Sequence, residues 1–376
     1  MIYLDNINKF NSNKTSKIRS IIKQDTVSSC FFRSSVDPPN RKAVIRITDV
    51  CNAHCVHCFI SADNRGETMS LENFRDFVLP RIQQCRVSSV TLTGGEPFLH
   101  SNILDIVQLL TNADIRTGIC TNANVITDEQ IHILATNSKV HINVSLHGFS
   151  PESHDRFMAK KGAFKKCIST IELLSKYDLI QGILVTPNNF ADVKEYEKLC
   201  EFAIQIKAKY VLMNPLSSMG RGVDNVSKYA ASEEMLQSIR KMTQKYSERI
   251  QLVYIRFPNN DLPLGYCEAG NIFYIFVNGN VTICAYLDFA ANTPMSQYNP
   301  KEFIIGNILQ DPDLSQKLDA YRFLDRYKFG ENDHCKRCEK NSVCGKGCPS
   351  AVIYAGKKIG DVDSDVCPEI KQEESS

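Results

Sequence analysis

From Lys42 to Phe257, short apolar runs alternate with amphipathic stretches, and few folds accommodate such a pattern. Repeated strand–helix units with right-handed crossovers build a parallel sheet covered by helices. Six runs are predicted to be strands: Ala43–Ile47, Ser89–Leu92, Ile115–Cys120, His141–Leu146, Ile180–Val185 and Tyr210–Met213. The helices between them are expected near residues 70–85, 101–112, 127–136, 164–177, 191–206 and 232–247. We therefore predict an α/β fold, a partial (β/α)6 TIM-like barrel, whose working residues lie on loops that follow the strands.

The length of the chain indicates a second domain. At 376 residues it exceeds the roughly 250–300 residues at which one core stops growing. We place the barrel at residues 42–257 and a cysteine-rich domain at residues 258–376, because the strand–helix alternation stops there. From Cys335 onward apolar residues are few, so this segment would need bound metal to stay folded. Residues 1–41 are polar and basic and are expected to form an N-terminal arm.

Two local patterns stand out in the second domain. Asn278-Gly279 lies between the apolar runs Ile272–Val277 and Val281–Cys284, which is a strong signal for a two-residue hairpin. A single helix is expected near Leu314–Tyr327. Within the barrel, Thr127 with Gln130 predicts a capping box, and Ser232 predicts an N-cap.

Charge and hydropathy exclude several classes of protein. A net charge of +2 gives no case for a surface that binds nucleic acid or an anionic membrane. No apolar stretch approaches the ~20 residues of a membrane span, and Met1–Ser29 lacks the apolar core of a secretory signal. We therefore expect a cytoplasmic protein. In that compartment 15 cysteines favour metal ligation over disulfides.

Cys51, Cys55 and Cys58 directly follow the first predicted strand, with no fourth cysteine near enough in sequence to complete the set. Zinc sites usually pair cysteines as C-x2-C and complete a tetrahedron. The C-x3-C-x2-C spacing instead suits a 4Fe–4S cubane with three irons bound to protein and one left open. An open iron requires a small chelating molecule. Thr93-Gly94-Gly95-Glu96-Pro97 follows the second strand, where the glycines would admit a ligand and Glu96 could receive an ammonium group.

The triplet and the Gly-Gly-Glu-Pro segment together resemble the radical S-adenosylmethionine (radical SAM) superfamily. The resemblance implies that SAM binds the open iron and that one electron cleaves it to a 5′-deoxyadenosyl radical. A donor of the flavodoxin or ferredoxin type would supply that electron. The residues that the resemblance assigns to SAM are His57 and Leu216 at adenine, Ser145 at the ribose or methionyl end, Gly95 and Glu96 beside the ammonium group, and Arg156 at the carboxylate.

The later cysteines resemble, in number and spacing, the SPASM extension of radical SAM enzymes, so that the likeness covers about residues 42–370. It implies two auxiliary 4Fe–4S clusters whose ligands interleave along the sequence. Four thiolates would hold one cluster: Cys335, Cys338, Cys344 and Cys367. Only three would hold the other: Cys267, Cys284 and Cys348.

Two departures from the sulfatase-maturing members of this group narrow the expected activity. Those members carry an extra cysteine shortly after the first ligand of the extension, and none lies between Cys267 and Cys284. They also carry an aspartate directly after the second ligand, where this chain has Ala285. Both differences argue against formylglycine formation, and a three-thiolate cluster resembles peptide-modifying members. We therefore expect a ribosomally made peptide substrate that gains a thioether or carbon–carbon crosslink.

The resemblance also bears on how such a peptide is recognised. Most peptide-modifying members carry a peptide-binding winged-helix segment before the barrel. Residues 1–41 are too few to contain it. We therefore expect either a separate peptide-recognition protein or a leaderless substrate.

Two other functions fit parts of the sequence. One is dehydrogenation or epimerisation of a small molecule, such as a sugar in antibiotic biosynthesis, with Cys120 at the end of the third strand as a hydrogen-atom donor. The other is a zinc-stabilised binding module without catalysis, because C-x2-C at residues 335–338 is an ordinary zinc spacing. The remaining barrel cysteines share helical faces with apolar residues and are expected to be packed core thiols: Cys85, Cys167 and Cys200.

Overall fold

The computed structural model describes residues 36–258, 261–267 and 269–370 of the chain. Most of the predicted N-terminal arm, residues 1–41, therefore lies outside the described residues. Arg41 is already the first residue of a strand.

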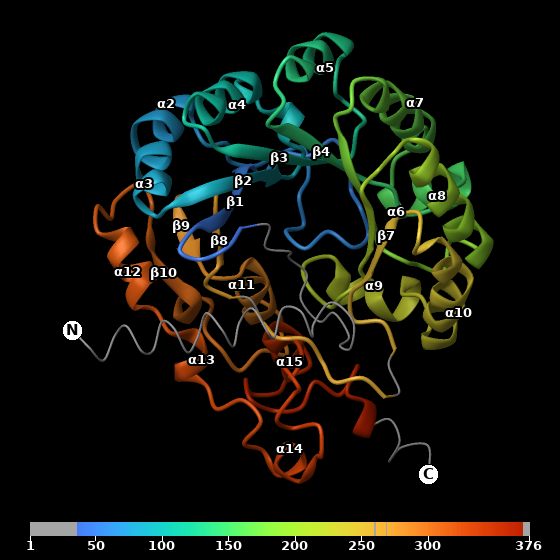
Figure 1. The fold of residues 1–376 in the computed structure, drawn as a ribbon, viewed down its shortest axis with the longest axis vertical. Coiled ribbons are helices and arrows are strands. Elements are labelled where there is room, and N and C mark those ends of the chain that lie inside the picture. Colours follow the sequence, from blue (N-terminus) through green and yellow to red (C-terminus); the bar gives the residue numbers. More distant parts are fainter. Residues whose placement is uncertain (1–35, 259–260, 268, 371–376) are drawn as a thin grey trace.

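Within these ranges ten strands form one sheet, in the order β10-β9-β8-β1-β2-β3-β4-β5-β6-β7 (Figure 1). Their bounds are β1 Arg41–Thr48, β2 Val87–Gly94, β3 Arg116–Thr121, β4 Val140–Ser145, β5 Ile180–Val185, β6 Tyr210–Met213, β7 Gln251–Tyr254, β8 Ile272–Ile275, β9 Asn280–Thr282 and β10 Ile304–Asn307. Neighbours from β1 to β7 pair in parallel, which confirms the predicted parallel sheet. The sheet extends beyond the six predicted barrel strands on both sides, because β7 pairs with β6 and β8 pairs in parallel with β1.

Helices follow the strands and cover the outer face of the sheet (Figure 1). Those that the sequence predicts are α2 Leu71–Asn73 with the π-helical η1 Phe74–Val78 and α3 Leu79–Gln84, α4 Ile103–Asn112, α5 Asp128–Ala135, α7 Ala163–Lys176, α8 Val193–Gln205, and α10 Glu233–Thr243 with η3 Gln244–Tyr246. The predicted capping box of Thr127 and Gln130 and the Ser232 N-cap are both present. The sequence does not predict α6 Pro151–Met158, α9 Gly222–Tyr229 or the short η2 Pro97–Leu99.

Side chains along each strand alternate between the two faces of the sheet. On β1, Ala43, Ile45 and Ile47 are buried in the main core between the sheet and its helices. Lys42 and Arg46 occupy the alternate positions of the strand, on the inner face. Burying one large aliphatic side chain contributes about 1.5–3 kcal/mol, so apolar packing on the outer side fixes the sheet.

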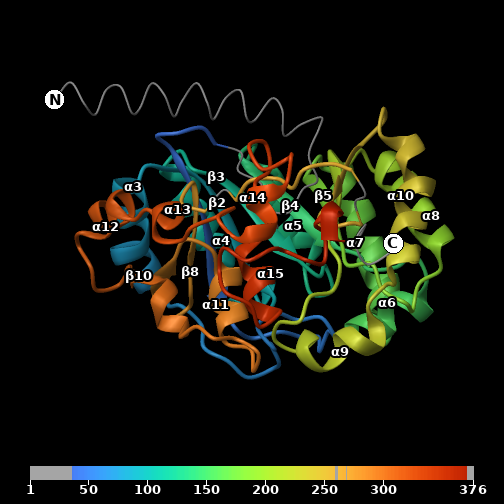
Figure 2. The same cartoon turned by 90° about the horizontal axis from the view of Figure 1, so that it is seen from below.

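The C-terminal region lies against the open side of the arc of strands (Figure 1 and Figure 2). Its helices are α11 Ala285–Ala291, η4 Pro300–Phe303, α12 Leu314–Ala320, α13 Phe323–Arg326, α14 Asp333–Arg337 and α15 Pro349–Tyr354. The predicted hairpin is present as the antiparallel pair β8–β9, and Gly279 in its turn has a left-handed φ of +85°. Its loop has three residues rather than the predicted two, because the N–H of Phe276 donates to the Asn280 carbonyl. None of the described helices combines the length and apolar character that crossing a bilayer requires.

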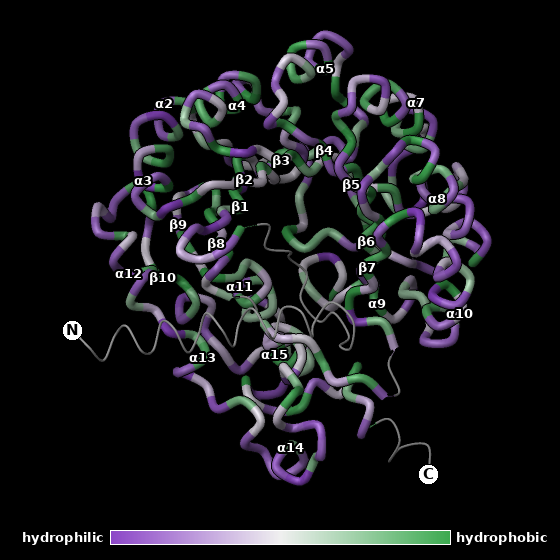
Figure 3. Tube along the Cα trace, in the orientation of Figure 1, coloured by the Kyte–Doolittle hydropathy of each residue, from purple (hydrophilic) through white to green (hydrophobic). Residues whose placement is uncertain are grey.

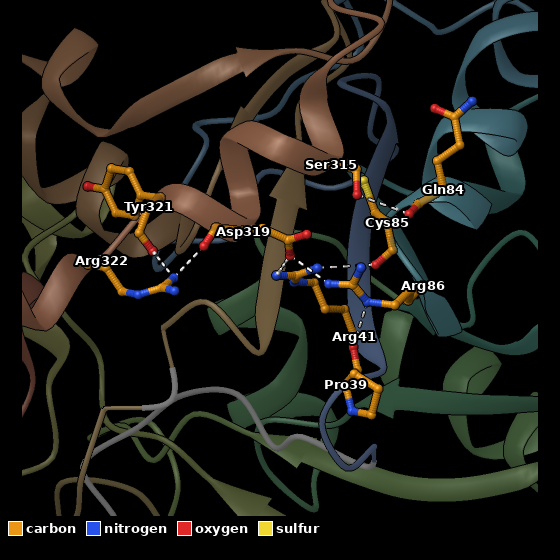
Figure 4. Close-up of polar contacts among 9 residues, drawn as sticks. All are labelled: Pro39, Arg41, Gln84, Cys85, Arg86, Ser315, Asp319, Tyr321 and Arg322. Atoms are coloured by element: carbon orange, nitrogen blue, oxygen red, sulfur yellow. Dashed lines mark hydrogen bonds and ion pairs between the residues drawn. The ribbon is translucent and has the colours of Figure 1, made fainter. Parts of the chain in front are cut away.

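The prediction of a single helix near Leu314–Tyr327 is wrong, because α12 and α13 are separated at Tyr321 and Arg322. Tyr321 has an extended conformation, and the Arg322 guanidinium donates to the carbonyl oxygen of Asp319 at the end of α12 (Figure 4). A side chain that satisfies a terminal carbonyl helps a helix to end. Phe323 then packs into the C-terminal core, and Tyr321 lies against it.

Asp319 also joins this region to the barrel (Figure 4). Its Oδ1 accepts hydrogen bonds from Arg41 at the start of β1 and from Arg86 just before β2, both at 2.6 Å. The Ser315 hydroxyl donates to the carbonyl oxygen of Gln84 at 3.0 Å. Partly exposed ion pairs contribute only about 0–1 kcal/mol each, so these contacts mainly fix how α12 lies against the barrel.

Candidate functional site

The loop that carries Cys51 is held by the glycine-rich segment after β2. The backbone N–H of Gly95 donates to the Thr48 carbonyl at 2.8 Å, and that of Glu96 donates to the Val50 carbonyl at 2.9 Å. A Cβ atom on Gly95 would overlap the Val50 carbonyl oxygen. The sequence predicts that these glycines make room for a ligand, whereas the structure shows that they let two backbones pack directly against each other. Gly95 therefore fixes where the cysteine loop begins.

The other side of the same loop rests on the C-terminal end of α6. The N–H of His54 donates to the Met158 carbonyl at 3.2 Å, and that of Val56 donates to the Phe157 carbonyl at 3.0 Å. The Met158 sulfur lies 3.3 Å from the Cys55 sulfur. Since the sequence does not predict α6, this support of the loop could not be anticipated.

Arg221 is a further support that a sequence pattern alone cannot assign. Its Nε donates to the Cys55 carbonyl and its Nη1 to the Ala62 carbonyl, both at 2.8 Å. Gly220 before it has a φ of +53°, and a Cβ atom there would overlap the Cys58 carbonyl oxygen. The segment Gly220-Arg221 thus encloses the loop from the side of β6.

These supports bring the three cysteines of the triplet into one small apolar cluster with Met158. Burial raises the pKa of Cys51 to about 11 and raises that of Cys55 further, so these thiols are protonated at neutral pH unless iron displaces the proton. The backbone N–H of Ala62 points at the Cys58 sulfur, at 3.4 Å. Amide N–H groups directed at sulfur are a normal environment of an iron–sulfur cluster.

Among the described residues, no three His, Cys, Asp or Glu side chains converge on a point where a single metal ion could be held. A zinc ion needs such convergence, with sulfur at about 2.3 Å. A cubane binds each thiolate to a different iron, so its ligands stand farther apart. One buried thiol, that of Cys51, and two half-buried ones, those of Cys55 and Cys58, in one apolar cluster fit the cubane.

Glu96 lies beside this cluster and is completely buried. Its carboxylate accepts hydrogen bonds from the Thr121 hydroxyl at 2.7 Å and from the backbone N–H of Asn122 at 2.8 Å. Burial nevertheless raises the pKa of Glu96 to about 7, and the charge of Glu96 raises the pKa of Cys51. A cationic ligand group at this carboxylate would gain from neutralising a buried charge, which fits the ammonium group of SAM.

His57, in the same region, has a ring nitrogen whose hydrogen-bonding capacity is unmet within the described residues. Its ring stacks on Phe157, with centroids 4.6 Å apart and planes 7° apart, and lies 4.4 Å from the His147 ring. Burial lowers the pKa of His57 to about 3, so the ring is neutral. Its buried Nδ1 has no hydrogen-bond partner in the described part of the chain. An unpaired buried nitrogen costs about 1–3 kcal/mol, and a purine edge could satisfy it.

The remaining predicted SAM contacts are less closely grouped. Ser145 ends β4, where its carbonyl oxygen lies 3.7 Å from the Cys167 sulfur. Leu216 is buried on the loop after β6. Arg156 is exposed on α6, with its guanidinium 4.3 Å from the centroid of the Phe190 ring. That cation–π contact engages Arg156 without a contact to the cysteine loop.

Cys120 is half-buried on the inner face of β3. Its thiol hydrogen-bonds the Asn143 side chain, and burial raises its pKa to about 11. The Asn143 Oδ1 in turn accepts from the Tyr210 hydroxyl at 2.7 Å. The three other barrel thiols, by contrast, are fully buried in the main core, which confirms that they are packed: Cys85, Cys167 and Cys200.

The C-terminal cysteines fall into two groups. Cys348 is buried in the C-terminal core, and Cys267 and Cys284 pack against that core. A second group is formed by Cys344 and Cys367, which pack against a separate small cluster. Burial raises the pKa of Cys367, and the charges of Cys344 and Cys335 add to this, while the N–H of Cys338 donates to the Cys335 carbonyl at 3.2 Å. The SPASM resemblance predicts two ligand sets, with Cys335 and Cys338 in the second.

A cavity of about 700 Å³ lies between the cysteine loop and the C-terminal region. Ser61 of the loop, the β8–β9 turn and α11 line it, with aromatic walls from Phe276 and Phe289. The residues after Cys58 and the helix after Cys284 therefore share one opening.

Residues 45–200 match the family model described as the radical SAM superfamily. The chain is 25% identical over 361 residues to the antilisterial bacteriocin subtilosin biosynthesis protein AlbA of Bacillus subtilis, covering 92% of this chain and 75% of that protein. It is 28% identical over 337 residues to an AdoMet-dependent heme synthase of Methanosarcina barkeri, covering 82% and 91%.

Among solved structures, the fold resembles that of Streptococcus suis SuiB bound to the precursor peptide SuiA. The TM-score is 0.68 at 16% identity, and the match covers 96% of this chain and 89% of that chain. The family match confirms the predicted resemblance to radical SAM enzymes, and the structural likeness confirms the mixed α/β fold with a parallel sheet.

Proposed function

We propose that this chain, whose residues 45–200 match the radical SAM family model, cleaves S-adenosylmethionine and modifies a ribosomally synthesised peptide, forming a thioether or carbon–carbon crosslink. The observation that carries this proposal is that Cys51, Cys55 and Cys58 lie in one apolar cluster, beside the buried carboxylate of Glu96. When bound, a 4Fe–4S cluster and SAM would supply the electron and the 5′-deoxyadenosyl radical.

The chain's own residues would bind and orient these groups. The triplet holds the iron, Glu96 receives the ammonium group next to Gly95, and the unpaired Nδ1 of His57 meets the adenine edge. The residues that complete the SAM site in this proposal are Ser145, Arg156 and the backbone of Leu216. Phe157 and Met158, at the end of α6, support the cysteine loop and would shield the thiolates from water.

The C-terminal cysteines would hold two auxiliary 4Fe–4S clusters. Two sulfur atoms of one set already accept bonds: Asn332 Nδ2 lies 3.3 Å from the Cys335 sulfur, and the N–H of Lys346 lies 3.4 Å from the Cys344 sulfur. In the other set the Ser350 hydroxyl lies 3.0 Å from the Cys348 sulfur. Donors placed at sulfur favour thiolates and clusters over packed thiols.

Two features support a peptide substrate. The names of AlbA and of the SuiB–SuiA complex concern bacteriocin biosynthesis and a bound precursor peptide, respectively. The cavity of about 700 Å³ is within the range that holds an organic ligand or a short peptide segment, and it opens beside the cysteine loop. A flavodoxin- or ferredoxin-type reductant and a separate peptide-recognition protein complete the proposed partners.

The proposal is tested by anaerobic reconstitution with iron and sulfide, followed by SAM and dithionite. The reconstituted enzyme should be brown and release 5′-deoxyadenosine, measured by liquid chromatography. Cys55→Ser should abolish that release, whereas Cys85→Ala, which changes a packed core thiol, should retain it. A colourless, zinc-loaded protein that never releases 5′-deoxyadenosine would contradict the proposal and favour a zinc-stabilised binding module.

A second candidate is a small-molecule dehydrogenase or epimerase, which the likeness to a heme synthase and the position of Cys120 favour. In an epimerase the Cys120 S–H bond would break as its hydrogen atom passes to a substrate carbon radical, and one electron from an auxiliary cluster with a proton from solvent would restore the thiol. Turnover in D2O would then place one deuterium in the product. In an epimerase, Cys120→Ala would lose the deuterated product but keep 5′-deoxyadenosine release. In a crosslinking enzyme, Cys120→Ala would keep both the crosslinked peptide and 5′-deoxyadenosine release.

A further inference from the structure

Arg256 is a buried arginine that none of the roles above uses. It follows β7, is 7% exposed, and has a left-handed φ of +49° that side chains rarely adopt. Its Nη1 forms an ion pair with Asp363, and its Nη2 lies 2.9 Å from Asp365 Oδ2. A buried charge is unfavourable unless it is paired, and here two carboxylates pair with one guanidinium.

Asp363 connects this arginine to a cysteine that we assign to an auxiliary cluster. The side chain of Asp363 is 2% exposed, and its Oδ2 also accepts the backbone N–H of Cys348 at 3.0 Å. Gly347, directly before Cys348, has a φ of +81°, and a Cβ atom there would lie 2.6 Å from the same oxygen. The turn that presents Cys348 is therefore built around the Asp363 carboxylate.

The same residues reach the second cysteine group. Cys367 follows Asp363 by one helical turn, and its N–H donates to the Asp363 carbonyl at 3.0 Å. Both members of the ion pair lie near enough to act on the Cys348 thiol, where the Asp363 carboxylate disfavours negative charge and the Arg256 guanidinium offsets it. One side chain from the end of the barrel thus fixes the Asp363 carboxylate at the Cys348 turn and compensates its charge there.

We propose that Arg256 is a positioning residue for the auxiliary clusters: its ion pair with Asp363 sets the Cys348 turn, and its charge favours the reduced state of the cluster that Cys348 binds. This inference rests on the proposed assignment of the C-terminal cysteines to clusters. Reduction adds one negative charge to a cluster, and a fixed cation nearby raises the reduction potential. Arginine is required because its planar fork engages two carboxylates at once.

The test uses the full-length, anaerobically reconstituted enzyme and four variants. Arg256→Met removes the charge and the fork, Arg256→Lys keeps only the charge, and Asp363→Asn keeps the shape but removes the paired carboxylate. Arg240→Met is the matched control, because Arg240 also packs near β7, over the Tyr254 ring, and donates to the Pro258 carbonyl. The readouts are bound iron, the midpoint potential of each cluster by electron paramagnetic resonance, and folding by circular dichroism.

We expect Arg256→Met and Asp363→Asn either to lose the iron of one cluster or to keep it with a midpoint potential that differs from that of the parent enzyme. Arg256→Met should shift the potential to more negative values, and Arg256→Lys should restore the potential more fully than the iron content. If the folded Arg256→Met enzyme keeps all its iron and all its potentials, or if Arg240→Met behaves alike, the inference is wrong. If the parent enzyme itself binds no iron at the C-terminal cysteines, the assignment of auxiliary clusters fails and this inference with it, whereas release of 5′-deoxyadenosine tests the cleavage of SAM separately.

Discussion

The two cysteine-bearing regions of this chain are built in opposite ways. The loop of Cys51, Cys55 and Cys58 is attached to long elements by backbone hydrogen bonds, from Gly95 on one side and to Met158 on the other. Of the C-terminal cysteines, Cys335 lies on the five-residue helix α14 and Cys348 directly precedes the six-residue helix α15, whereas the others lie outside helices and strands. The residues in and around α14 are largely hydrophilic (Figure 3).

The difference indicates which of the two cysteine sites is already folded before iron binds. The barrel has an apolar core that fixes the first loop without any metal. The outer C-terminal segment, residues 335–367, buries apolar side chains only on α15 and at Ile359 and Val366, and it buries none over residues 335–346. Its remaining order comes from buried polar contacts, chiefly the pair of Arg256 and Asp363. We infer that the barrel positions its cluster, whereas clusters hold the C-terminal segment together.

The largest expected effect comes from iron removal. With the metal chelated, peptides that cover residues 335–367 should exchange amide hydrogen more than about a hundredfold faster, corresponding to about 2.7 kcal/mol of lost local stability. Peptides from β1 to β6 should change little. Hydrogen–deuterium exchange with mass spectrometry measures both in one sample.

The contrast between the regions would break down if the chelated barrel exchanged as fast as the C-terminal segment. Re-addition of iron and sulfide under anaerobic conditions is the control, since it should restore slow exchange in residues 335–367.

Gly95→Ala should give the next largest effect, confined to the barrel site. The new methyl group would overlap the Val50 carbonyl oxygen, so the loop of Cys51 must move away from the segment after β2. We expect at least about a tenfold loss of 5′-deoxyadenosine release, equivalent to about 1.4 kcal/mol or more. The iron bound by the C-terminal cysteines should be unaffected.

Gly162→Asn is the matched control for that substitution. Gly162 also lies in the barrel, has a left-handed φ of +81°, and has nothing within 4 Å of an added Cβ atom. Asparagine tolerates this conformation, so release of 5′-deoxyadenosine should be unchanged. An active Gly95→Ala enzyme would show that backbone packing does not position the triplet.

The same contrast explains what the sequence could and could not predict. The strands and helices of the barrel follow from local periodicity, and caps such as Thr127 with Gln130 follow from residues three positions apart. The C-x3-C-x2-C spacing of Cys51, Cys55 and Cys58 likewise predicts a shared site, because cluster ligands must lie within a short reach of one another. Each of these signals is contained in a short stretch of sequence.

The supports of both sites depend on contacts between distant residues. Arg221 donates to a carbonyl 166 positions away, and Arg256 pairs with a carboxylate 107 positions away. The split of the helix at Tyr321 depends on packing into the C-terminal core, which periodicity within α12 does not reveal. No pattern within either segment specifies such partners.

A smaller effect is expected from low pH, which should destabilise the fold through the buried histidines His147 and His154. Burial lowers the pKa of His154 to about 4 and that of His147 well below its ordinary value of 6.5. The unfolded chain takes up these protons first, so stability should fall as the pH drops from about 6.5 toward 4, by up to about 1.4 kcal/mol per pH unit for each histidine. Urea unfolding of the iron-free protein at pH 7 and pH 5 measures the loss, and His154→Gln should reduce it. An equal loss in that variant would mean that other groups cause the acid sensitivity.

The smallest effect compares one helix cap in each region. Asp192 caps α8 in the barrel with a capping box, and Asn332 caps α14 by accepting the N–H of Cys335 at 2.8 Å. Removing either cap with alanine should cost about 1 kcal/mol in urea unfolding of the holoenzyme. Only Asn332→Ala should also release iron, because Asn332 Nδ2 additionally contacts the Cys335 sulfur and donates to the Gly360 carbonyl at 2.8 Å. If both variants kept their iron equally well, the C-terminal segment would be as independent of its metal as the barrel, and the contrast between the two regions would lose its basis.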